Sequence, residues 1–307
     1  MPAMRDVFWN QLYDHAKQDR NIVILSADFS APSLDRFRLE LPAQYIRLGI
    51  AEQNMILMAA GLALEGKRPF CYAISPFLTM RCFEQIRLYA AGMNLPITLV
   101  GVGAGFSYAD SGYTHHALED VSLLRTLPHM RIFQPCDNAS VREMTELILQ
   151  SDGPAYLRLD RYGVETAAFD PETIGKGFQV ARPVQKVTLA ASGYMVKTAL
   201  TAAEQLAASG IPVGVVDICT LPCDAALCGI LSEVQTLVTL EEHTLPGGLG
   251  SYLMELASEK GLSAQIHRLG LDLSDGYPEE YSGRETLHRM YGIDAESIVQ
   301  LIKRLEK

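Results

Sequence analysis

Residues 47–66 set the architecture of the chain and read Arg47-Leu-Gly-Ile-Ala-Glu-Gln-Asn-Met-Ile-Leu-Met-Ala-Ala-Gly-Leu-Ala-Leu-Glu-Gly66. A short extended piece, 45–48, enters this stretch through Gly49, and a helix of small and apolar residues follows. Because both faces of that helix are apolar, we expect it to be buried behind a strand. Glu52 lies in its first turn, where the helix dipole favours a charged carboxylate.

Glu52 has two interpretations. Burial among apolar neighbours opposes its ionisation, and a buried Glu without a hydrogen-bond partner costs several kcal/mol. Taken alone, the residue is more readily a capping Glu on a core helix than a catalytic acid, since structural ion pairs are the commoner case. The surrounding sequence has to decide between the two.

Composition and charge restrict the class of protein. The 307 residues fit two domains of ordinary size, and the net charge of −10 argues against non-specific binding to nucleic acid or anionic membranes. No signal peptide is visible, and the longest apolar run, 55–64, is too short to span a bilayer. Cys219, Cys223 and Cys228 lie close together, but their spacing matches no metal-binding pattern. We therefore expect a cytoplasmic α/β protein with six reduced thiols and no metal ligands of its own.

Strands alternate with helices along the first half, which predicts a parallel sheet with helices on both faces. The expected strands are 22–27, 70–74, 97–102, 131–134 and 155–158, and the expected helices are 5–18, 77–91 and 138–150. A polar loop, 28–33, follows the first strand, at the end of a parallel strand where ligands bind.

A second alternating region follows a change of composition, so the chain is expected to form two doubly wound domains, 1–165 and 183–307, joined by a linker at 166–182. Its expected strands are 187–191, 213–218, 236–240 and 264–267, and its expected helices are 195–208, 225–231 and 295–305. Glu241-Glu-His243 and the glycines of 247–250 precede another helix, and these glycines suit either a bound anion or a tight strand-to-helix turn. No catalytic cluster is evident in this half.

The segment 103–120 is long and lacks periodicity, and a loop of that length between a strand and a helix is usually functional. Its glycines allow the backbone to approach a ligand closely. His115 and His116 are adjacent and so point in different directions, which argues against a shared metal. Hydrogen bonding or proton transfer suits them better.

Several motifs in a fixed order resemble one known family. Gly49-Ile-Ala-Glu-Gln-Asn-Met55 is similar to the cofactor motif of the pyrimidine-binding domain of transketolases. The other matching stretches are Arg81-Cys-Phe-Glu-Gln-Ile-Arg87, Thr114-His-His116, Glu119-Asp120 and Gly153-Pro-Ala-Tyr-Leu-Arg158. With these motifs in order, nearly the whole chain resembles the C-terminal half of a transketolase: a pyrimidine-binding domain, a linker and a transketolase C-terminal domain.

The resemblance implies a set of residues for thiamine diphosphate. Glu52 would hydrogen-bond the aminopyrimidine ring and favour the tautomer that activates the thiazolium carbon. Phe77 is our choice for the aromatic that stacks on the pyrimidine. Asp28 would lie near the cofactor or a subunit contact, and Arg81 belongs to the same cofactor-binding set.

The resemblance also implies residues for the sugar. His115 would face the sugar hydroxyls and the developing alkoxide, and Arg158 would hold the sugar phosphate through its bidentate fork, with Arg5 as a second arginine. One departure stands out: the usual loop reads Asp-Gly-Pro-Thr-His, whereas here Ser111 replaces the Asp that reads a sugar hydroxyl. Loss of that carboxylate predicts an altered sugar specificity, for a branched or more anionic sugar.

The chain lacks the Gly-Asp-Gly…Asn motif with which transketolases hold Mg²⁺ and the diphosphate. The simplest account is a split enzyme in which a separate N-terminal subunit binds the diphosphate and the metal, in an α2β2 assembly. The reaction implied is transfer of a two-carbon ketol unit from a ketose, as its phosphate or a related sugar, to an aldose. Three alternatives stay open: a 2-oxoacid dehydrogenase beta-type subunit, a deoxyxylulose-phosphate-synthase-type subunit, and a scaffold subunit without cofactor.

Overall fold

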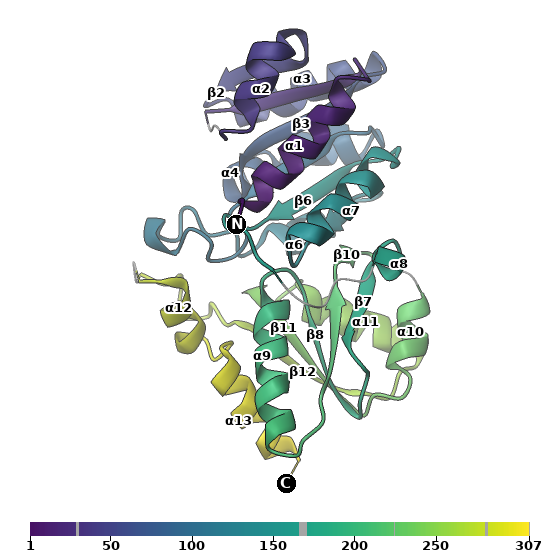
Figure 1. Cartoon of the computed structure of the whole chain (residues 1–307), viewed down its shortest axis with the longest axis vertical. Coiled ribbons are helices and arrows are strands. Elements are labelled where there is room, and N and C mark those ends of the chain that lie inside the picture. Colours follow the sequence, from purple (N-terminus) through teal and green to yellow (C-terminus); the bar gives the residue numbers. More distant parts are fainter. Residues whose placement is uncertain (29–30, 166–170, 224, 280–281, 307) are drawn as a thin grey trace.

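The computed structural model describes residues 1–28, 31–165, 171–223, 225–279 and 282–306. Two sheets organise these residues and lie one beyond the other along the long axis of the molecule, with helices against them (Figure 1). The first sheet has the strand order β10-β5-β6-β4-β3-β1-β2, and the second has the order β12-β11-β8-β9-β7. The prediction of an α/β fold with two doubly wound halves is confirmed.

The first sheet is parallel apart from one edge strand. Its strands are β1 (Ile22–Ala27), β2 (Tyr45–Gly49), β3 (Arg68–Ile74), β4 (Thr98–Val102), β5 (Arg131–Phe133) and β6 (Ala155–Leu159). Strand β10 (Thr220–Leu221) comes from the second half of the sequence and pairs antiparallel with β5. The main helices of this half are α1 (Met4–Ala16), α2 (Leu34–Glu40), α3 (Glu52–Leu64), α6 (Asp120–Leu124) and α7 (Asn138–Leu149).

Helix α3 is buried on one face only. Met55, Ile56 and Ala59 are fully buried beside the sheet, as the apolar sequence predicts. The outer face, which we also expected to be buried, exposes Leu57 and Leu64. Within the part of the chain that the structure describes, no element covers this side of the helix closely enough to bury these side chains.

The helix predicted at 77–91 is broken. The structure has α4 (Ser75–Thr79), α5 (Phe83–Gln85) and a π-helical segment, Ile86–Ala91. Around the break, Gln53 Nε2 donates to the carbonyl of Arg81 at 3.1 Å, and Cys82 Sγ donates to the carbonyl of Phe77 at 3.5 Å. These bonds replace part of the regular helical pattern and turn Arg81 toward α3.

The second sheet is parallel except for β7, which pairs antiparallel with β9 at its edge. Its strands are β7 (Phe178–Arg182), β8 (Val187–Ala191), β9 (Gly214–Ile218), β11 (Thr236–Thr244) and β12 (Gln265–Leu271), and its helices include α9 (Met195–Ala208), α10 (Ala226–Leu231), α11 (Leu249–Lys260), α12 (Arg284–Met290) and α13 (Ala295–Leu305). Residues 178–182, which we assigned to the linker, therefore belong to this sheet. Of the remaining linker, 166–170 lies outside the described residues.

One of the hydrophobic clusters extends across both halves. A single cluster of buried side chains joins Leu25 and Met55 of the first half to Ile218, Leu237 and Leu253 of the second. All six cysteines are described, and none forms a disulfide. Among the described residues no helix is long and apolar enough to cross a membrane, and no three His, Cys, Asp or Glu side chains gather as metal ligands would.

Candidate functional site

Four residues predicted to bind a cofactor line one pocket. The pocket has a volume of about 280 Å³ and opens where β1 and β3 end, because Ala27 and Ile74 contribute to its wall. Asp28, Glu52, Phe77 and Arg81 complete the lining, with Ile50 and Ala73. The carboxyl ends of parallel strands bring together residues that lie 53 positions apart in the sequence, from 28 to 81.

Glu52 is the buried charge of this pocket. Its side chain is only 6% exposed, and its Oε2 accepts a hydrogen bond from Arg81 Nη1 at 2.8 Å. The Arg81 guanidinium also lies over the ring of Phe77, 4.6 Å from the ring centroid, and its side chain is 42% exposed. The pocket therefore combines an ionisable carboxylate, an aromatic wall and a cation that contacts both.

Asp28 lies on the solvent side of the same pocket. Its Oδ1 accepts a hydrogen bond from Arg47 Nη2 at 2.7 Å, and both side chains are about half exposed. A pair with this exposure contributes little to stability. It leaves Asp28 available to a ligand or to another chain.

His115 connects loop 103–120 to the pocket. Its imidazole meets the ring of Phe77 edge-on, with the centroids 5.2 Å apart, and it also contacts Tyr108. Its Nδ1 lies 3.0 Å from Thr114 Oγ1. His116 faces elsewhere and is buried against Phe106, and this burial lowers the pKa of its imidazole.

Ser111 belongs to a polar chain on the same loop. Ser111 Oγ donates to Asp110 Oδ1 at 3.3 Å, and Asp110 in turn pairs with Arg161 Nη1 at 3.3 Å. The guanidinium of Arg161 lies over the ring of Tyr108. Our sequence analysis did not single out Arg161, although its position just after β6, at the end of a parallel sheet where ligands bind, makes it a candidate.

Arg158 does not reach this site, which corrects our expectation that it would hold a phosphate. Its side chain is 6% exposed, and its Nε donates to Asp120 Oδ2 at 2.8 Å. Its Nη2 donates to the carbonyls of Ala117 and Glu242 at 2.9 and 3.3 Å. The guanidinium is committed to fixing the base of loop 103–120 and is not presented to solvent.

Arg5 lies on the loop side of α1, near two tyrosines. Burial raises the pKa of Tyr72 and of Tyr108, and the positive charge of Arg5 opposes that rise in both. Arg5 and Arg161 thus approach Tyr108 from two elements. Two cations therefore lie beside the aromatic that contacts His115.

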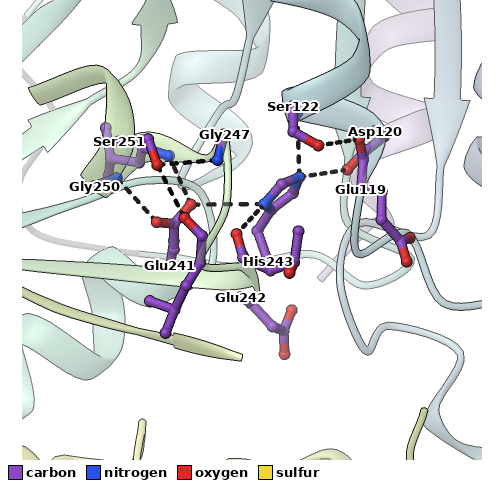
Figure 2. A network of polar contacts seen from close by, with 12 residues as sticks. Glu119, Asp120, Ser122, Glu241, Glu242, His243, Gly247, Gly250 and Ser251 are labelled. Atoms are coloured by element: carbon purple, nitrogen blue, oxygen red, sulfur yellow. Dashed lines mark hydrogen bonds and ion pairs between the residues drawn. The ribbon is translucent and has the colours of Figure 1, made fainter. Parts of the chain in front are cut away.

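The second half supplies a buried polar network where it meets the first (Figure 2). Glu241 accepts the backbone N–H groups of Leu249 at 2.6 Å and Gly250 at 2.9 Å, at the start of α11. Burial raises the pKa of Glu241 to about 7, and the two N–H donors oppose that rise. The glycine turn at 247–250 is thus filled by the protein's own carboxylate, so the anion-site interpretation of these glycines is not needed.

His243 joins the two halves as a neutral imidazole. Its Nδ1 donates to the carbonyl of Thr244 at 2.8 Å, and its Nε2 accepts from the N–H of Ser122 at 3.3 Å. Burial lowers its pKa to about 4, so the ring stays uncharged at neutral pH. Figure 2 shows Asp120 beside the same ring nitrogen as Ser122. The distance from Nε2 to Asp120 Oδ1 is 3.9 Å.

Comparisons with known proteins agree with this fold. The chain matches the model of the transketolase pyrimidine binding domain over residues 1–165 and that of the transketolase C-terminal domain over residues 176–298. A 6-deoxy-6-sulfo-D-fructose transketolase subunit of Clostridium sp. strain MSTE9 is 36% identical over 97% of this chain and 92% of its own length. An apulose-4-phosphate transketolase subunit of Actinobacillus succinogenes is 32% identical over 91% of this chain and 90% of its own length. A solved split-gene transketolase, described as an inactive beta4 tetramer, superimposes with a TM-score of 0.86 at 32% identity, over 99% of this chain and 98% of that one.

Proposed function

The chain belongs to the transketolase family, and we propose that it is the pyrimidine-binding subunit of a split enzyme that moves a two-carbon ketol unit from a ketose to an aldose. Members of this family are thiamine-diphosphate enzymes. The observation that carries the proposal is the pocket in which Glu52, Phe77 and Arg81 converge. A scaffold that had lost the cofactor would have no reason to keep a buried carboxylate there.

The residues present fit the pyrimidine end of thiamine diphosphate. When bound, this cofactor supplies the carbanion-stabilising chemistry that ketol transfer needs. The Glu52 carboxylate would share a proton with a ring nitrogen of the aminopyrimidine, in a site that largely excludes water. Arg81 holds that carboxylate in place through the 2.8 Å contact, and Phe77 supplies an apolar face for the ring.

We assign the sugar to the side of the pocket where loop 103–120 approaches. His115, which contacts Phe77, would orient a sugar hydroxyl and stabilise oxygen charge during bond cleavage. Arg161 takes over the anion-binding role that we first gave to Arg158, because Arg161 is partly exposed beside Tyr108. The positive charge of Arg5 also acts on Tyr108 and supports Arg5 as the second arginine. A guanidinium suits a phosphate or sulfonate group.

Ser111 supports an unusual sugar. Its hydroxyl is a weaker acceptor than the carboxylate of the usual motif, and it is engaged with Asp110. Two relatives are transketolase subunits for sugars outside the common pentose phosphates, one a sulfo-sugar and the other apulose 4-phosphate. We propose an anionic sugar of altered skeleton as the substrate, within carbohydrate metabolism.

We further propose that a separate N-terminal subunit holds the diphosphate and Mg²⁺. Two relatives that the chain matches over 92% and 90% of their own length are themselves named as transketolase subunits. Its exposed apolar side chains, among them Leu57 and Leu64 of α3, are available for subunit contacts in an α2β2 assembly. The chain alone would then be inactive.

Native mass spectrometry of the chain, purified from its own cells with thiamine diphosphate and Mg²⁺, tests this proposal. We expect a stoichiometric second subunit with bound cofactor, and ketol transfer between sugars by the isolated complex. A homodimer with neither cofactor nor second chain would refute the split enzyme. Decarboxylation of a 2-oxoacid without ketol transfer would instead favour the dehydrogenase or synthase type.

A further inference from the structure

We infer that Arg284 and Glu242, both in the C-terminal half, are positioning residues for the sugar-binding side of the site. They act on two segments of the other half: the arm 160–162, which carries Arg161, and the loop 103–120, which carries His115. The inference rests on the proposed function, because it assigns a task to residues that hold the proposed substrate groups. It gives the C-terminal half a role in catalysis although no residue of it lines the cofactor pocket.

Arg284 makes three hydrogen bonds, two to Glu242 of its own half and one to Asp160 of the other half. Its Nε and Nη2 donate to Glu242 Oε1 and Oε2 at 2.8 and 2.6 Å, and its Nη1 donates to Asp160 Oδ2 at 2.6 Å. The Arg284 side chain is 12% exposed, and both carboxylates are nearly buried. His288 contacts Glu242 as well. Burial alone would raise the pKa of Glu242, but Arg284 and His288 hold it well below its ordinary value, so the carboxylate is charged.

Asp160 transmits this contact to the arm. Its Oδ1 accepts the backbone N–H of Tyr162 at 2.9 Å, which closes a tight turn around Arg161. The N–H of Arg161 donates to Ser107 Oγ at 3.4 Å, and its guanidinium reaches Asp110. Arg284 therefore fixes the residue immediately before Arg161, and the turn sets the direction in which that guanidinium points.

Glu242 acts on the loop by direct packing. Gly105 has φ +54°, and a Cβ built there would lie 2.0 Å from Glu242 Oε2, so the carboxylate lies against the loop backbone. The same loop continues to His115. One guanidinium–carboxylate cluster thus fixes both segments that face the sugar, and a displacement of about 1 Å at such a site is enough to lower activity by up to about a hundredfold.

A second bridge between the halves provides a matched control. Arg125 donates to the carbonyl of Gly247 at 3.1 Å and pairs with Glu255, without contact to the arm or to loop residues 103–118. If Arg284 only stabilised the assembly, Arg284→Lys and Arg125→Lys would affect the enzyme alike. The two variants therefore separate positioning from general stabilisation.

The test uses the reconstituted complex with ribose 5-phosphate and unphosphorylated ribose as acceptors. For Arg284→Lys we expect the KM for the phosphorylated acceptor to rise about tenfold and the KM for ribose to change by less than about twofold, while kcat falls by a similar factor with both acceptors because loop 103–120 shifts as well. Arg125→Lys should leave all three unchanged. Asp160→Asn should reproduce the effect of Arg284→Lys, and the double variant should add little, because both act through one contact.

The inference would be overturned if Arg284→Lys and Arg125→Lys changed the KM for the phosphorylated acceptor equally. It would also be overturned if the effects of Arg284→Lys and Asp160→Asn on that KM were additive. Arg161→Ala separates this failure from failure of the proposed site. If Arg161→Ala raises the KM for the phosphorylated acceptor and Arg284→Lys does not, only the positioning role falls. If neither variant does so, the anion-binding role of Arg161 falls with it.

Discussion

Replacing Glu52 by Gln is the change that bears most directly on the proposed chemistry. The substitution keeps the shape of the side chain and one acceptor oxygen but removes the charge and the ability to share a proton. The only ion-pair partner of Glu52 among the described residues is Arg81, at 2.8 Å. The effect on the fold and the effect on activity can therefore be worked out separately.

The expected loss of stability is small. Arg81 is 42% exposed, so water can solvate its guanidinium once the carboxylate is gone. Solvent screening limits the value of such a pair to about 1 kcal/mol or less. Activity should fall much further, by about 10²- to 10⁴-fold, which is the usual contribution of a positioned proton-transfer group. This corresponds to about 3–5 kcal/mol of transition-state stabilisation.

The assay is ketol transfer by the complex reconstituted with Glu52→Gln, with thermal unfolding and native mass spectrometry on the same sample. Glu65→Gln is the matched control, because it makes the same chemical change at the exposed far end of α3. We expect intact assembly, a nearly unchanged Tm and a severe loss of turnover for Glu52→Gln only. Retention of more than about a tenth of the activity would refute the proton-sharing role. A loss that parallels dissociation or unfolding would make Glu52 a structural residue.

Four further outcomes are expected. Phe77→Ala should raise the Kd for thiamine diphosphate in the complex by about tenfold, since it removes the apolar face for the ring; an unchanged Kd in a cofactor titration would exclude stacking there. Arg158→Met should lower the free energy of unfolding by about 3–5 kcal/mol in urea, because it leaves Asp120 buried without its partner, and a milder loss would contradict the structural role of Arg158. Ser111→Asp should raise kcat/KM for ordinary pentose phosphates relative to kcat/KM for anionic sugars of altered skeleton, and the opposite change would refute the specificity argument. Burial raises the pKa of Asp217 from 3.8 to about 7, so the contribution of this carboxyl to stability is present below pH 3.8 and is lost as the pH rises through 7. Between pH 5 and 8 the free energy of unfolding should therefore fall less for Asp217→Asn than for the native chain. Equal decreases for the two proteins in urea titrations would contradict this.

The sequence predicted what depends on local pattern. Strand β1, helix α9 and helix α13 lie where hydrophobic periodicity places them, and the first turn of α3 brings Glu52 to the end of the sheet. Arg158 misled us because a motif match does not determine on which side of a strand a side chain lies. Arg158 lies within β6 and turns into the protein, whereas Arg161 follows the strand, is partly exposed and pairs with Asp110 of loop 103–120.

Contacts between distant segments were beyond sequence reasoning. Arg284 and Asp160 are 124 residues apart, and nothing in either local sequence indicates the pairing. Helix α12, which carries Arg284, was not predicted at all, and β11 extends four residues past its expected end so that Glu241, Glu242 and His243 lie on the strand. Only the packing of the two sheets shows that Glu242 lies against Gly105 and His243 against Ser122 of the other half.

The small strand β10 makes the chain a poor candidate for modular engineering. It closes the β5 edge of the first sheet with residues from beyond position 219, and the core beneath it is shared by both halves. A fragment ending at residue 165 would expose that edge as a template for pairing with other molecules. Chimeras with other transketolases should therefore exchange both halves as one cassette, or carry the matching edge strand along with the sheet that it completes.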